Sequence, residues 1–154
     1  MKNGKRPSIP QLVRIADAVF SKYIRLRDAT TYVQTEDGLS LDAGPCITCN
    51  RIGPIKYMDC GHFITRGCKL TRFDERNAHL QCKRCNGPMM GEQYKHSQAI
   101  SNRYGELVLL ALTKLERQYK QHGHKWTREE LETIIATYRK KFLELRNKEA
   151  CSVL

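Results

Sequence analysis

Long apolar segments are absent from this sequence, which limits where the protein can act. No run of apolar residues approaches the roughly 18 that a membrane-spanning helix requires. The polar stretch after Met1 contains Lys and Arg but lacks the apolar core of a signal peptide. We therefore expect a cytoplasmic protein with no membrane partner, in a reducing environment that disfavours disulfide bonds.

Acidic and aromatic residues are also scarce. Asp and Glu number 16 against 27 Lys and Arg, so the net charge is +11, and the 154 residues include one Trp. A chain of this length is one ordinary domain with a modest core and room for only a compact site. The positive charge favours a polyanionic partner, which could be DNA, RNA or acidic lipid. Alternatively, it is a solvated surface that serves only solubility.

The N-terminal part reads as one helix followed by a connector. Over residues 9–28, apolar side chains recur at three- and four-residue spacing and basic side chains lie off that stripe, which predicts an amphipathic helix with a basic side. Residues 29–45 are rich in Thr, Asp, Gly and Pro. They predict a long connector, with at most a short strand at residues 32–34.

The C-terminal part is predicted to be helical. Helical spacing returns over residues 91–119, with a break expected near Gly105. A last helix is predicted over residues 127–146, because Thr127 and Glu130 have the spacing of a capping box before another apolar stripe. The tail that follows is expected to fray.

These patterns predict an α+β fold in three parts. Residues 1–45 form the N-terminal helix and connector, residues 46–91 a zinc-bound core, and residues 92–154 a helical region. The middle part holds six of the seven cysteines.

Four cysteines have the spacing of a zinc site. Cys46 and Cys49 form one CxxC pair, and Cys82 and Cys85 form a second after 32 intervening residues. Two such knuckles can close on a tetrahedral Zn²⁺, and a shell of four thiolates leaves no position for water. We therefore expect a structural zinc. Unligated core cysteines or a redox pair are the alternatives.

The other cysteines lie outside the paired spacing. We expect Cys60 and Cys68 to be small buried apolar residues, and Cys151 to be a free surface thiol.

Between and after the knuckles, three residues could hydrolyse a phosphodiester. Asp59 and Asn86 offer hard oxygen ligands for Mg²⁺ or Mn²⁺, and a neutral His62 could accept the proton of the attacking water. Each of them could instead have a structural role, as a cap or a packed side chain. The zinc frame favours the catalytic interpretation, because Asn86 directly follows Cys85 and is thereby held near the segment that carries Asp59 and His62.

Further residues could support this site. Asn77 could fix the intervening loop through backbone hydrogen bonds, and His79 could contact a phosphate or simply pack. The candidates for phosphate contacts are basic residues of the same segment, each of which could also be only solvated: Arg66, Lys69, Arg72, Arg76, Lys83 and Arg84.

The motifs resemble two phage families. The two CxxC pairs, Asp59-x2-His62 and Cys85-Asn86 look like the zinc, metal and base motifs of recombination endonuclease VII, a His-Me finger nuclease with an HNH-like site. Over roughly residues 15–148 the chain is more extensively similar to the lambdoid phage NinG (Rap) recombination family. That similarity rests on Lys22-Tyr23-Ile24-Arg25-x-Arg27-Asp28, Cys46-Ile47-x-Cys49, Gly61-His62-Phe63, Arg72-Phe73-Asp74-Glu75-Arg76-Asn77-x-His79-x-Gln81-Cys82 and His124-x-Trp126-Thr127.

The resemblance implies a bacteriophage DNA-recombination endonuclease that cuts Holliday junctions and other branched DNA in the host cytoplasm. It implies a zinc-held ββα-metal core flanked by helices, with Asp59 and Asn86 binding the catalytic cation and His62 acting as general base. Because symmetric cleavage needs two active sites, we also expect a homodimer packed through the C-terminal helices. The alternatives are a zinc-ribbon nucleic-acid adaptor without catalysis and an HNH-type nicking endonuclease. A redox protein would not explain His62 and Asn86.

Overall fold

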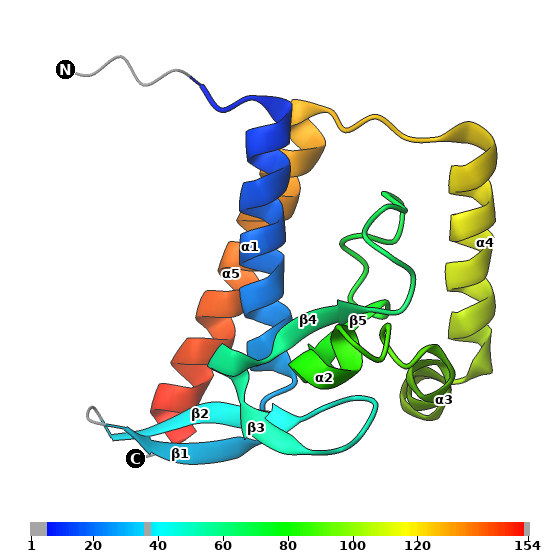
Figure 1. Cartoon of the computed structure of the whole chain (residues 1–154). Helices are drawn as coiled ribbons and strands as arrows, with labels where there is room; N and C mark the ends of the chain where they lie inside the picture. Colours follow the sequence, from blue (N-terminus) through cyan, green and yellow to red (C-terminus); the bar gives the residue numbers. More distant parts are fainter. Residues whose placement is uncertain (1–5, 36–37, 153–154) are drawn as a thin grey trace.

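In the computed structural model, helices surround two small antiparallel sheets (Figure 1). The structure describes the backbone of residues 6–35 and 38–152, and the side chains of residues 6–34 and 40–147. The mixed α+β fold class is confirmed. In chain order the elements are α1 (Ile9–Arg27), β1 (Thr31–Thr35), β2 (Gly38–Pro45), β3 (Ile52–Pro54), the 3-10 turn η1 (Ile55–Tyr57), β4 (Asp59–His62), β5 (Ala78–Gln81), α2 (Lys83–Asn86), α3 (Gln93–Tyr104), α4 (Glu106–His122) and α5 (Arg128–Ser152).

Helices α1 and α5 lie side by side and run in the same direction (Figure 1). Both predicted helices are therefore confirmed, and the apolar stripe of each is buried against the other. Leu12 and Ala16 of α1 pack with Leu131 and Ile135 of α5, and further along Phe20 packs with Tyr138. The helical backbone of α5 continues to Ser152, beyond the predicted end of the helix.

The connector predicted over residues 29–45 is wrong for most of its length, although the short strand expected at residues 32–34 is confirmed as part of β1. Residues 31–35 and 38–45 form two antiparallel strands, and the second also pairs with β3, so that Gly44 lies opposite Gly53. The turn-forming residues that suggested a connector stand largely at strand ends. The stretch Thr31-Tyr32-Val33 has the β-branched and aromatic side chains that favour strands. The resulting sheet crosses the expected boundary between residues 45 and 46.

Helices α3 and α4 form the other side of the molecule (Figure 1). The predicted break is confirmed at Gly105, whose φ of 87° suits glycine and separates the two helices. Leu112 of α4 packs against Ile64 and Cys68 of the loop between β4 and β5. None of the described helices has the length and apolar character needed to cross a membrane.

Strands β4 and β5 form a central hairpin that leads directly into α2. Asp59 lies opposite Gln81 and His62 opposite Ala78. Asp28 attaches this hairpin to the end of α1, because its carboxylate accepts a 2.9 Å hydrogen bond from the Leu80 N–H and pairs with Arg103 of α3 at 2.9 Å. The hairpin is therefore fixed between α1 and α3.

Candidate active site

The four paired cysteines form one cluster. Their sulfur atoms all lie within 4.8 Å of one another, and the Cys49 and Cys82 sulfurs are 3.8 Å apart. Zn–S bonds of about 2.3 Å in a tetrahedron place neighbouring sulfurs about 3.8 Å apart. The cluster thus has the size and donor set of a structural zinc site, and no other such metal-binding group occurs among the described residues.

The backbone around the cluster favours the thiolate of Cys46, whereas burial raises the pKa of Cys49 and Cys85. Asn50 adopts a left-handed conformation with φ of 56°, which closes the first knuckle, and the Cys82 N–H donates to the Cys46 sulfur at 3.3 Å. Burial raises the pKa of Cys46, but the Cys82 N–H and the Thr48 hydroxyl outweigh it and lower this pKa to about 6. Cys46 is therefore predisposed to bind metal.

The remaining cysteines lie apart from this cluster. Cys68 is buried beside Leu112, as expected for a small apolar residue. Cys60 is partly buried and faces the cleft described next, where burial raises its pKa to about 12. The side chain of Cys151 lies outside the described residues.

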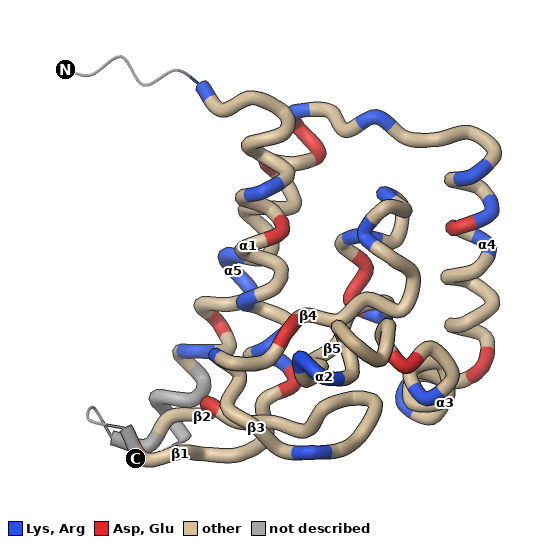
Figure 2. The backbone as a smooth tube through the Cα atoms, viewed as in Figure 1, with Lys and Arg blue, Asp and Glu red and all other residues tan. Residues whose placement is uncertain are grey.

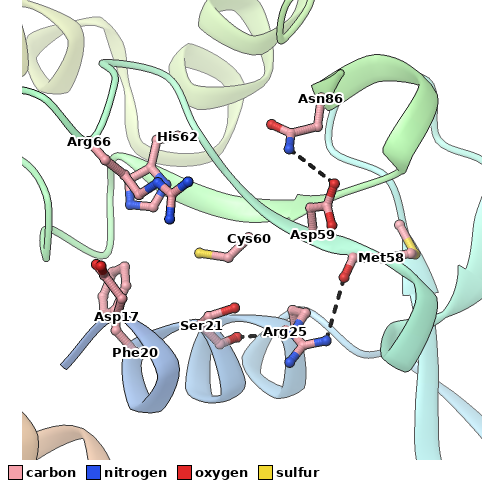
Figure 3. Close-up of a pocket in the computed structure, with 10 residues that line it drawn as sticks. All are labelled: Asp17, Phe20, Ser21, Arg25, Met58, Asp59, Cys60, His62, Arg66 and Asn86. Carbon is pink, nitrogen blue, oxygen red and sulfur yellow. Dashed lines mark hydrogen bonds between the residues drawn. The ribbon is translucent and has the colours of Figure 1, made fainter. Parts of the chain in front are cut away.

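A cleft of about 430 Å³ lies between α1 and the β4–β5 hairpin (Figure 3). It brings together Asp59 and His62 from β4 and Asn86 from α2, the three residues that the sequence suggested for catalysis. The other lining residues come largely from α1 and the ends of β4: Asp17, Phe20, Ser21, Arg25, Met58, Cys60 and Arg66.

Asp59 and Asn86 are direct neighbours in this cleft. The Asn86 amide donates to one Asp59 carboxylate oxygen at 3.0 Å, and the Lys83 ammonium lies 2.9 Å from the other (Figure 3 shows the first contact). Both side chains are only partly buried. Two oxygen-bearing side chains at this spacing could share a divalent cation.

His62 is held in one orientation by its surroundings. Its Nε2 lies 2.9 Å from the Arg72 carbonyl oxygen, which can only accept, so this contact favours a proton on Nε2. Burial and the nearby charge of Arg66 lower the pKa of His62, and together they outweigh the backbone contacts with Arg72 and Cys60 and the charge of Asp17, which raise it. The imidazole is therefore neutral at pH 7 and able to accept a proton.

Asn77 and His79 lie in the interior. Asn77 accepts from the Ile64 N–H at 2.7 Å and donates to the carbonyls of Ile64 and Thr71 at 2.9 and 3.0 Å, which fixes the ends of the intervening loop. His79 is fully buried, and its Nδ1 lies 3.2 Å from Nε2 of His96. Packing is therefore its observed role in this structure, and no phosphate can reach it without rearrangement.

Several of the basic candidates are held by intramolecular contacts. Arg72 forms a bidentate pair with Asp17, Arg76 pairs with Asp74, and Lys83 pairs with Asp59.

Of the other three basic candidates, Arg66 and Arg84 remain available for phosphate contacts, and Lys69 does not. Lys69 donates to the carbonyl oxygen of His124 at 2.8 Å. Arg66 and Arg84 are exposed, and neither side chain bonds to another described residue.

Sequence reasoning missed three residues that shape the site. Asp17 holds Arg72, whose carbonyl orients His62. Arg25 donates to the carbonyls of Ile55 and Met58 and thereby fixes the chain just before Asp59. Both lie on the predicted helix at residues 9–28, but only packing reveals that they face the cleft. His96, the partner of His79, carried no signal in the sequence.

Comparisons with known proteins match this chain to a family of bacteriophage proteins. The family model described as bacteriophage lambda NinG protein matches residues 8–149. Over 104 residues, which are 67% of its length, this chain is 36% identical to the protein ninG of Escherichia phage 933W, 35% identical to that of Salmonella phage P22 and 34% identical to that of Escherichia phage lambda. The chain spans about half the length of these relatives, 48–49% of each. No solved structure matches it. The chain thus belongs to the NinG family of lambdoid phage proteins.

Proposed function

We propose that this chain is a metal-dependent, structure-specific DNA endonuclease that cuts Holliday junctions and related branches, built on a zinc-held ββα-metal core of the His-Me finger type. One observation carries the proposal: Asp59, His62 and Asn86 line a single cleft on a β4–β5–α2 unit. The four-cysteine cluster includes Cys82 and Cys85 at the start of and within α2, and Cys85 directly precedes Asn86.

Asp59 and Asn86 would hold the catalytic Mg²⁺ or Mn²⁺. When bound, the cation supplies positive charge to the scissile phosphate and to the leaving oxygen. In the structure Asn86 turns its amide nitrogen towards Asp59. To act as a ligand, Asn86 would present its oxygen, which requires a rotation of the amide. Lys83 is largely exposed and can then leave Asp59 for a phosphate.

His62 would act as the general base. Its Nδ1 takes a proton from a water molecule while the water oxygen bonds to phosphorus and the bond from phosphorus to the leaving oxygen breaks. The Arg72 carbonyl keeps Nε2 protonated throughout and stabilises the imidazolium that forms. Arg66 lies at the same cleft and can bind the phosphate.

The proposal includes a homodimer, because two cuts require two active sites. The stripe of α5 is covered by α1 of the same chain and is not available for this contact. Leu107 and Leu110 of α4 are 79% and 66% exposed and offer an uncovered apolar face on a C-terminal helix. Sedimentation of the wild type and of Leu107→Glu/Leu110→Glu tests this, and a monomer in both would remove the dimer from the proposal.

The activity is tested with a labelled four-way junction and a matched linear duplex, with Mg²⁺, with Mn²⁺ and with neither cation added. We expect cation-dependent cleavage of the junction and little cleavage of the duplex. Equal cleavage of both would favour a nicking HNH enzyme. Binding of both without any cleavage would favour a zinc-ribbon adaptor.

His62→Ala sharpens this test, because a general base serves the chemical step and not zinc or DNA binding. Cleavage should fall by roughly 10² or more while zinc content and junction binding are kept. Excess Mn²⁺ should partly restore Asp59→Ala and Asn86→Ala, but not His62→Ala. His122→Ala on exposed α4 is the matched control and should cleave normally. Retained cleavage in folded His62→Ala would contradict the assigned role.

A further inference from the structure

A second hollow, here called the basic groove, lies beside the candidate active site. It has a volume of about 440 Å³ and is bordered by α1, α5 and the segment around η1. Four cations line it: Lys22 and Arg25 of α1, Lys56 of η1 and Arg146 of α5. Residues distant in the sequence are thus gathered on one side, and Figure 2 shows basic residues on both helices.

None of these four residues forms an ion pair with a carboxylate in the part of the chain that the structure describes. Lys22, Lys56 and Arg146 are exposed and form no ion pair with the described residues. Arg25 donates to carbonyl oxygens, which are neutral, and so it keeps its net positive charge. One acid, Asp42, also lines the groove.

The basic groove adjoins the candidate active site. Arg25 lines both hollows, so a ligand that passes this side chain extends from one into the other. Two of the basic residues that the sequence suggested near His62 are paired with acids: Arg72 with Asp17 and Lys83 with Asp59. The cations of the basic groove therefore add to the unpaired positive charge that Arg66 and Arg84 offer to a long polyanion.

We propose that the basic groove holds the phosphate backbone of one DNA arm whose scissile phosphate lies at Asp59 and His62, an inference that rests on the proposed function. Duplex DNA carries one negative charge per roughly 1.7 Å of axis, which the four cations of the groove complement. The floor of the groove is apolar, with Leu26, Ile55 and Phe142, and offers a surface for deoxyribose between the phosphates.

The test compares two triple variants that remove equal charge. The groove variant is Lys22→Gln/Lys56→Gln/Arg146→Gln. The control is Lys114→Gln/Arg117→Gln/Lys125→Gln, which changes exposed cations of α4 and of the segment after it. Helix α4 lies on the other side of the molecule from α1 and α5 (Figure 1). Arg25 is left intact, because it fixes the chain before Asp59. Melting temperature and zinc content show that both variants are folded.

Affinity for a labelled four-way junction is measured without added Mg²⁺ or Mn²⁺, so that binding is read without cleavage while the structural zinc is kept, between roughly 50 and 200 mM salt. The groove variant should bind about tenfold or more weakly, and its slope of log affinity against log salt should fall by about one for each lost contact. The control should keep the wild-type slope.

Equal weakening in both variants would overturn the proposal, since only general charge would then matter. Polyglutamate that displaces the junction from wild type but not from the groove variant, at matched charge, would instead assign the groove to an acidic protein. Failure of the groove proposal can be distinguished from failure of the proposed nuclease function. Groove-dependent binding without any cleavage would refute only the nuclease, and junction cleavage with a groove variant identical to the control would refute only the groove.

Discussion

Single buried polar side chains decide the shape of the loop between β4 and β5. Asn77 has no exposed surface and is hydrogen-bonded at both its oxygen and its nitrogen to backbone atoms of that loop. The loop carries Arg72, whose carbonyl orients His62. A residue without any role in chemistry thereby controls the direction of the candidate base.

Asn77→Asp should destabilise the protein strongly. The carboxylate keeps the acceptor for the Ile64 N–H but places its second oxygen against the carbonyls of Ile64 and Thr71. We expect a loss of about 3 kcal/mol in the free energy of unfolding, measured with urea. Asn102→Asp, at an exposed site, should change it by less than about 0.5 kcal/mol. Equal effects at both sites would show that the loop does not depend on Asn77.

The two buried histidines should make stability depend on pH. Burial lowers the pKa of His79 to about 3 and that of His96 to about 4, below the ordinary value near 6.5. Between the lowered pKa of each histidine and the ordinary value, the unfolded chain binds a proton that the folded chain does not bind. The contribution of these two histidines to the free energy of unfolding should therefore be constant above about pH 7 and fall as pH drops, by up to about 1.4 kcal/mol per group and pH unit, and His62 adds to the fall.

Urea titrations from about pH 7 to pH 5 measure this fall. His96→Gln removes one of the two groups and should make the curve flatter. A curve as steep as that of the wild type would mean that the acid sensitivity arises elsewhere.

At the scale of elements, β2 must approach the end of α1 very closely. A Cβ at Gly44 would lie 2.5 Å from the Asp28 carbonyl oxygen and 2.9 Å from a methyl carbon of Leu80. These neighbours belong to the junction that attaches β5 to α1, so the close approach of three elements depends on the missing side chain at this position.

Gly44→Ala should accordingly force the sheet away from α1. We expect a loss of about 1–3 kcal/mol in the free energy of unfolding, which is the usual range for overpacking. Gly53 is the cross-strand partner of Gly44, and a Cβ there would meet only Met58 at 3.4 Å. Gly53→Ala is thus the control and should be nearly neutral. Denaturant unfolding of both variants gives the comparison, and equal stability would argue against the crowding.

For the whole molecule, the cysteine cluster joins the β2–β3 connection to the start of α2. The two knuckles lie far apart in the sequence, and only a few apolar residues pack around them, so the hydrophobic core of this region is minor. Metal binding and folding of this region should therefore be coupled.

Cys82→Ser should lose zinc and thermal stability together. Wild type should contain one zinc per chain, and a strong chelator should lower its melting temperature. Cys68→Ala also removes a buried thiol but lies outside the cluster. It should melt at a lower temperature while keeping its zinc. Zinc content by atomic emission and thermal melts of all three proteins decide this, and a Cys82→Ser protein with full zinc would refute the site.

The sequence alone supports the helices and the zinc frame, because both depend on local spacing. The stripes of α1 and α5, the break at Gly105 and the two CxxC pairs are regular patterns with direct physical meaning. Of the strands at residues 31–35 and 38–45, the sequence predicted only a short strand at residues 32–34. The two strands pair with each other, and the second escaped prediction because its Gly, Asp and Pro residues are typical of a connector.

Tertiary structure alone decided which residues meet at the cleft and which cations are free. Asp59, His62 and Asn86 could be proposed from their positions beside the cysteines, but nothing in the sequence indicates that Asp17 neutralises Arg72 or that Asp59 neutralises Lys83. The same holds for Lys22, Lys56 and Arg146, which α1, η1 and α5 bring to one groove. Ion pairs and grooves form between distant segments, so they depend on packing, whereas helices and metal knuckles are encoded within a few consecutive residues.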